Sequence, residues 1–75
     1  MVGDQHEMEI SVMINGKEAS LPPGMTVASY LSLRELNDRL VVVELNGEII
    51  RRTEFPSVTI STGDQIEIVH FVGGG

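Results

Sequence analysis

A chain of 75 residues has room for one domain, and five basic residues against eleven acidic ones give it a net charge of −6. This balance argues against nucleic-acid binding, which needs clustered lysine and arginine, and no apolar run approaches the roughly 20 residues that span a bilayer. The chain has no cysteine or tryptophan and no metal-ligand spacing, so a small hydrophobic core must hold the fold together.

The first half of the chain begins with a polar, acidic segment, 1–7, which we expect to be a short disordered leader and not a signal peptide. Residues 8–14 nearly alternate between apolar and polar, which predicts a strand with one buried face. Asn15-Gly16 is a strong hairpin signal, so residues 17–21 should return as a second strand. The Pro22-Pro23-Gly24 run ends that strand, because proline cannot donate a ladder hydrogen bond.

One helix is predicted in the middle of the chain. Thr26 is a suitable N-cap, since its hydroxyl can accept a hydrogen bond from the first turn. The helix should end near Arg34 to Glu35, with Leu33 and Leu36 covering its far end and Asn37-Asp38 in a loop. One face of this helix is apolar: Val27, Tyr30 and Leu31.

The second half predicts a further hairpin, in which residues 40–45 pair with residues 48–52 across Asn46-Gly47. Residues 53–56 form a short turn or one helical turn, from which Phe55 anchors into the core. The segment 58–60 should be extended.

A last strand, 65–72, follows a turn at Gly63-Asp64 and leads into a flexible glycine tail, 73–75. The folded domain would then span residues 8–72. This order of elements predicts an α+β fold, in which one main helix packs on one face of a mixed sheet of about five strands.

The glycine tail leaves the terminal carboxylate on a thin stem that can enter a tunnel too narrow for side chains. A carboxylate is a poor electrophile, so a partner would have to activate it, for example as an acyl adenylate. A frayed chain end is the alternative interpretation of the glycines taken alone. The rest of the chain shows no paired carboxylates and no nucleophile motif, and His70 lacks a catalytic companion.

The last strand also predicts an apolar patch on the sheet face opposite the helix. If Ile66 and Ile68 point to the helix, then Val69 and Phe71 point away from it. The alternative is a bulge, which would reverse the parity and bury Phe71. Such a patch beside the tail would serve as a docking surface. The residues assigned to it are Met13, Val42, Val69, Phe71, Val72 and Gly73.

The end of the chain carries a pattern that is specific in combination: Gly-Asp-x-Ile-Glu-Ile-Val from Gly63, followed by apolar residues and a terminal Gly-Gly. Together with Ile14-Asn15-Gly16, the Thr26-Val27 helix start and the hairpin 42–50, it resembles the ThiS family of sulfur carriers in thiamin biosynthesis. The resemblance covers roughly residues 9–75 and implies the ubiquitin-like β-grasp fold, with the first and last strands parallel in the centre.

The resemblance also implies a mechanism. A ThiF-type enzyme would use ATP to adenylate the Gly75 carboxylate, with Gly74 beside it, and sulfur derived from a cysteine desulfurase would convert it to a thiocarboxylate. A ThiG-type thiazole synthase would accept the sulfur. The chain would be a cytoplasmic cosubstrate and not an enzyme, and it would bind no cofactor. The third glycine, Gly73, departs from the family pattern but leaves the last two positions intact.

Three other functions remain open from the residues. The small subunit of molybdopterin synthase would share the fold and the thiocarboxylate but deliver sulfur to a pterin precursor. A ubiquitin-like modifier would instead join its activated terminus to a lysine. A pure binding module would use no terminal chemistry.

Overall fold

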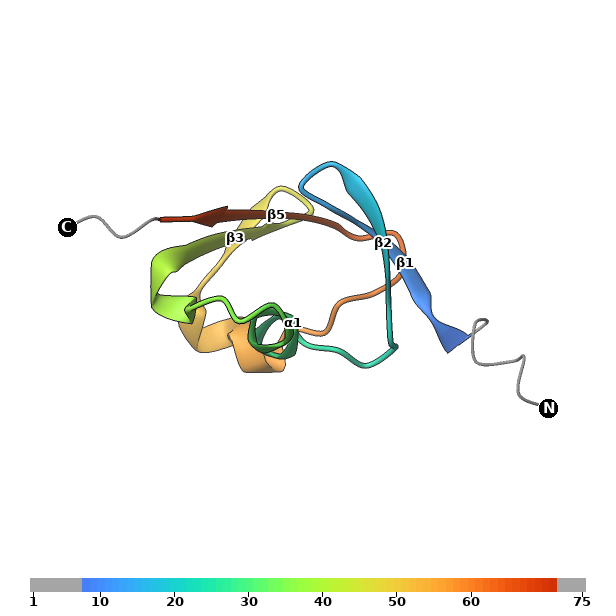
Figure 1. Cartoon of the computed structure of the whole chain (residues 1–75), viewed down its shortest axis with the longest axis horizontal. Helices are drawn as coiled ribbons and strands as arrows, with labels where there is room; N and C mark the ends of the chain where they lie inside the picture. Colours follow the sequence, from blue (N-terminus) through green and yellow to red (C-terminus); the bar gives the residue numbers. More distant parts are fainter. Residues whose placement is uncertain (1–7, 72–75) are drawn as a thin grey trace.

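The computed structural model describes residues 8–71, which form one mixed five-stranded sheet in the order β2-β1-β5-β3-β4. Strands β1 and β5 run parallel, and the other three neighbouring pairs of strands are antiparallel. Figure 1 shows helix α1 and the 3-10 segment η3 on the same side of this sheet. This arrangement is the β-grasp fold and confirms the predicted α+β class. The elements are β1 (Ile10–Ile14), β2 (Lys17–Leu21), α1 (Val27–Leu33), η2 (Asp38–Leu40), β3 (Val41–Leu45), β4 (Glu48–Ile50), η3 (Arg52–Ser57) and β5 (Gln65–His70).

Both predicted Asn-Gly turns are confirmed. Asn15 and Gly16 have φ angles of 51° and 81°, and Asn46 and Gly47 have 53° and 87°. Two successive positive φ angles give the turn a twist that matches the right-handed twist of the flanking strands. The two outer hairpins, β1-β2 and β3-β4, are therefore set by local sequence.

Helix α1 begins and ends with the expected kinds of cap. The Thr26 hydroxyl accepts a hydrogen bond of 3.1 Å from the Ser29 N–H. At the other end Glu35 N–H donates to the Ser32 carbonyl at 3.0 Å, and Leu36 N–H donates to the Leu31 carbonyl at 2.9 Å. These two bonds form a Schellman motif. Within residues 8–71 no helix has the length and apolar character needed to cross a membrane.

Glu35 occupies the position of this motif that favours glycine, with a φ of 58°. A side chain in this left-handed region costs about 1–2 kcal/mol, whereas glycine avoids the clash but loses more backbone entropy. Replacing Glu35 by glycine should therefore raise the free energy of unfolding by about 1 kcal/mol, measured by urea denaturation. The matched control is Ser32→Gly inside the helix, which should lower it by roughly 0.5–1 kcal/mol. A loss of stability in both variants would contradict the prediction.

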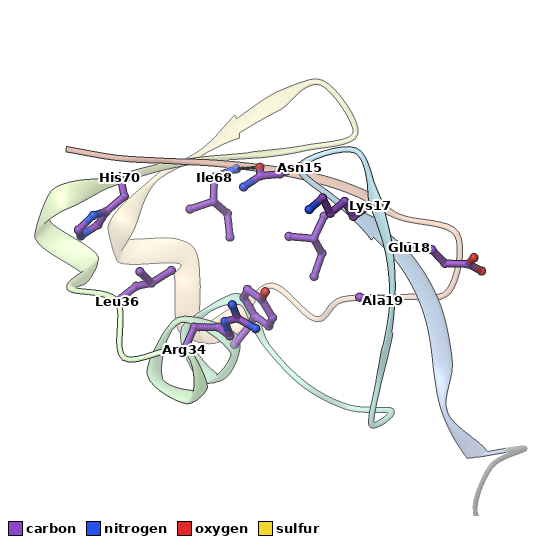
Figure 2. A pocket seen from close by; sticks show the side chains of 10 residues that line it. Asn15, Lys17, Glu18, Ala19, Arg34, Leu36, Ile68 and His70 are labelled. Carbon is purple, nitrogen blue, oxygen red and sulfur yellow. Dashed lines mark hydrogen bonds between the residues drawn. The ribbon is translucent and has the colours of Figure 1, made fainter. Parts of the chain in front are cut away.

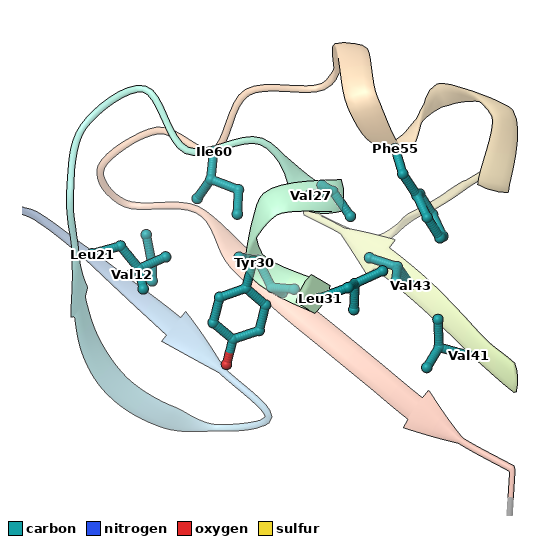
Figure 3. Packing of buried hydrophobic residues seen from close by; sticks show 10 residues of the cluster. Val12, Leu21, Val27, Tyr30, Leu31, Val41, Val43, Phe55 and Ile60 are labelled. Carbon is teal, nitrogen blue, oxygen red and sulfur yellow. The ribbon is translucent and has the colours of Figure 1, made fainter. Parts of the chain in front are cut away.

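The core lies between the sheet and the α1–η3 side, and the predicted helical face is part of it. Figure 3 shows Phe55 projecting from η3 toward the strand that carries Val43, and the Phe55 side chain is only 2% exposed. The anchoring role predicted for Phe55 is thus confirmed. The buried side chains are Val12, Leu21, Val27, Tyr30, Leu31, Val41, Val43, Phe55, Ile60 and Ile66.

One core prediction at the end of the helix is wrong. Leu33 is 60% exposed, while Leu36 is partly buried and packs against the core. Successive helical residues turn by about 100°, so Leu33 lies roughly 200° from Leu31 and faces away from the sheet. The Schellman turn after Arg34 then brings Leu36 back toward the core.

Several predicted boundaries also differ. Strand β1 begins at Ile10, not at residue 8, and β4 ends at Ile50. Asn37 does not lie in a simple loop, because its side-chain oxygen accepts from Arg39 N–H at 2.9 Å and starts η2. The segment 58–60 is extended but joins no sheet strand, since its pairing is a single bridge between Thr59 and Thr26.

Candidate functional site

The central strand β5 carries the candidate site, and its pairing with β3 is regular. The register runs without interruption from Val41 opposite His70 to Leu45 opposite Ile66. Phe71 N–H continues it by donating to the Leu40 carbonyl at 2.8 Å. There is no bulge to reverse the side-chain alternation, so Phe71 remains on the face opposite α1. We call this face of the sheet the outer face.

The two turn asparagines also fix β5, a role that the sequence analysis missed. Asn15 Oδ1 accepts from Ile68 N–H at 2.7 Å, and Asn46 Oδ1 accepts from Gln65 N–H at 2.9 Å. Asn46 Nδ2 also donates to Asp64 Oδ1 at 3.0 Å. The signal in the sequence was the choice of asparagine in both turns, because its amide can both accept and donate while its backbone tolerates positive φ.

Three apolar side chains meet on the outer face at the end of β5. Val42 lies directly opposite Val69 in the register, and Phe71 follows two residues later on the same face. Val69 is 55% exposed and Phe71 is 54% exposed, whereas Val42 is half-buried. We call Val42, Val69 and Phe71 the terminal patch.

Met13 lies on the outer face but not in the terminal patch, contrary to expectation. It pairs with Gln65, four residues before Val69 on β5, and Glu67 stands between these two positions on the same face. Parity predicted the correct face, but only the parallel register of β1 and β5 gives the position along the strand. Met13 is therefore separated from the patch by about 13 Å of extended strand.

Acidic side chains border the terminal patch. Glu67 is directly opposite Glu44 across β3 and β5, and Glu44 in turn pairs with Ile49 on β4. Ile49 is 67% exposed and adds an apolar position on the outer face that was not predicted from the sequence. By parity and register, the charged groups that the described strands place on this face are carboxylates: Glu18, Glu44 and Glu67.

The remaining predicted site residues are Val72, Gly73, Gly74 and Gly75, and they lie outside the described residues. Gly75 follows Phe71 by four positions, a separation that spans at most about 14 Å of extended chain. Among residues 8–71 there is no cluster of three or more histidine or acidic side chains that could hold a metal ion.

Comparison with known proteins gives a consistent result. The model of the ThiS family matches residues 7–75. The chain is 38% identical over 65 residues to the sulfur carrier protein ThiS of Bacillus subtilis, covering 85% of this chain and 98% of that protein. A crystal structure of the thiamine biosynthesis protein ThiS from Geobacter metallireducens has a TM-score of 0.75 at 33% identity, and the match covers 88% of this chain and all of that one.

A third relative is much longer. The chain is 38% identical over 66 residues to a thiazole synthase of Paramagnetospirillum magneticum, which covers 88% of this chain but only 20% of that protein. The chain thus spans about a fifth of that relative. The family match over almost the whole chain, the identity to a full-length carrier and the shared fold agree: the chain belongs to the ThiS family.

Proposed function

We propose that this protein is a sulfur carrier of thiamin biosynthesis whose reactive group is the carboxylate of Gly75. The observation that carries the proposal is the family match through residue 75, which includes the terminal glycines, together with a relative of nearly equal length that is named a sulfur carrier. The last strand before this terminus is β5, which is paired on both sides in the centre of the sheet.

Activation would proceed at the terminal carbonyl carbon. The carboxylate attacks the α-phosphate of ATP on a ThiF-type enzyme, and pyrophosphate leaves as the acyl adenylate forms. A persulfide sulfur derived from a cysteine desulfurase then attacks the carbonyl carbon, and AMP leaves as an acyl disulfide forms. A thiol cleaves the sulfur–sulfur bond of this acyl disulfide, which releases the thiocarboxylate and leaves the two thiol sulfurs joined as a disulfide. The glycines suit this step, because a stem without side chains, Gly73 to Gly75, can enter a narrow active site.

The acceptor in this proposal is a ThiG-type thiazole synthase. Support comes from the Paramagnetospirillum relative, in which a segment similar to this chain is part of a protein named thiazole synthase. A carrier and its acceptor joined in one polypeptide meet at a high effective concentration. In either arrangement, the carrier domain would contact its acceptor through a surface of its fold.

We assign that docking role to the terminal patch, with Val72 and Gly73 extending it toward the reactive end. Exposed apolar side chains next to acidic ones suit a partner that offers an apolar recess bordered by basic groups. When Phe71 is bound by the partner, Gly75 would lie within about 14 Å of the Phe71 contact. The protein itself would act in the cytoplasm as a cosubstrate without a bound cofactor, and ATP would be used by the activating enzyme.

Intact-mass measurement tests this function directly. The full chain is incubated with ATP, a sulfur source and a ThiF-type enzyme, and a chain with an amidated Gly75 serves as the control. We expect exchange of one oxygen for sulfur in the first sample only, and loss of that sulfur when thiazole synthase and its substrates are added. A stable adduct on a lysine would indicate a protein modifier, and sulfur delivered only to a pterin precursor would indicate a molybdopterin pathway.

A further inference from the structure

A pocket of about 410 Å³ opens on the helix side of the sheet, away from the outer face. It lies between the β1-β2 hairpin, the end of α1 and the last residues of β5 (Figure 2). Its volume is within the range of roughly 300–1,000 Å³ that is usual for small-molecule sites. Nothing in the proposed function uses it.

Most of the polar side chains around this pocket carry hydrogen-bond donors. Lys17 from β2, Arg34 from the end of α1 and His70 from β5 line it together, and Figure 2 shows them on different sides of the same space. Two of the five basic residues of an acidic chain thus converge at one place. Among the hydrogen bonds that side chains make within residues 8–71, none involves Lys17 or Arg34.

Two neutral groups add to the donors. Asn15 uses its Oδ1 for the Ile68 N–H, so its Nδ2 group keeps free hydrogens beside the pocket. Tyr30 is 7% exposed, and Figure 3 shows its hydroxyl at the far end of the ring, away from the other core side chains. A hydroxyl can donate to an anion by rotating its hydrogen.

The one acidic residue along the pocket does not present its charge there. Figure 2 shows the Glu18 carboxylate pointing away from the pocket, and its Oε2 accepts a hydrogen bond of 3.0 Å from the Ser11 hydroxyl. Two outer-face residues make this contact, because Ser11 and Glu18 both alternate away from the helix. The pocket is therefore rich in donors and poor in acceptors.

The geometry points to a binding site for a small organic phosphate in this pocket. A phosphomonoester offers two negative charges and three acceptor oxygens, which match two cationic side chains and several neutral donors. The partly buried side chains of Leu36 and Ile68 line the same space and would contact the organic part of the ligand. The site is independent of the docking and chemistry at the outer face.

Titration with phenyl phosphate, followed by amide NMR shifts of the full chain at constant ionic strength, tests the site. We expect saturable shifts at residues around the pocket, such as Ala19 and Ile68, and weaker binding of inorganic phosphate, which lacks the apolar ring. Arg34→Gln should raise the Kd for phenyl phosphate roughly tenfold, the usual cost of losing a hydrogen bond to a charged group. Lys17→Gln should also raise the Kd for phenyl phosphate.

The matched control is Arg52→Gln, which removes another exposed arginine, on η3 and outside the pocket. It should leave the Kd unchanged. A rise in Kd for Arg52→Gln as large as that for Arg34→Gln would overturn the proposed site. Amide shifts that spread over the surface without saturating would also overturn it. Tighter binding of a short glutamate peptide than of phenyl phosphate would also overturn it, since the pocket would then receive an acidic protein segment.

Discussion

Phe71→Glu is expected to lower kcat/KM for thiocarboxylate formation roughly thirtyfold or more, the effect typical of a central docking residue. The reason is the placement of Phe71 in the terminal patch, where the residue is about half exposed and the neighbouring charges are acidic. A glutamate at this position would have to lose its hydration against an apolar recess without gaining a partner. The loss should appear mainly in KM, because the Gly75 carboxylate itself is unchanged.

Leu33→Glu provides the matched control for this prediction. Leu33 is 60% exposed, similar to the 54% of Phe71, but it lies on α1, on the other side of the sheet. Leu33→Glu should keep the wild-type kcat/KM for thiocarboxylate formation. Both variants should unfold at nearly the wild-type urea concentration. Equal rates for the two variants, or an unfolded Phe71→Glu chain, would refute the docking role of the terminal patch.

The sequence predicted the fold well because its signals are local. Each Asn-Gly pair fixes a hairpin through two positive φ angles, and the Thr26 hydroxyl fixes the start of the helix by its hydrogen bonds to Ser29. Alternation along 65–71 then decides which side chains face the helix. The central pairing of β1 with β5 joins residues more than 50 positions apart, and it was known only from the resemblance to a family.

What the sequence did not predict depends on register and on side-chain direction. Alternation placed Met13 on the correct face, but its distance from Val69 is set by the pairing of Met13 with Gln65. The pocket beside Arg34 was missed for a similar reason. Lys17, Arg34 and His70 are far apart in the sequence, and three separate elements must fold before they line one space.

Phe55→Ala should have the largest effect on stability of any single substitution considered for this chain, a loss of about 3–5 kcal/mol in the free energy of unfolding. Phe55 is the largest of the fully buried side chains and has only 2% of its surface exposed. A domain of this size is expected to have a total stability of about 4–11 kcal/mol. Removing the ring would therefore cost a large part of the total free energy of unfolding, because the short segment η3 has no other buried side chain to hold it against α1.

Urea denaturation at equilibrium measures this loss, and two further variants test its cause. Phe55→Leu fills most of the space and should cost clearly less than Phe55→Ala, because the penalty grows with the cavity that is left. Ile49→Ala removes an apolar side chain that is 67% exposed and should change the stability by no more than about 0.5 kcal/mol. A similar loss for Phe55→Ala and Ile49→Ala would show that η3 is not anchored through the Phe55 ring, and the packing of this side of the sheet would need another explanation.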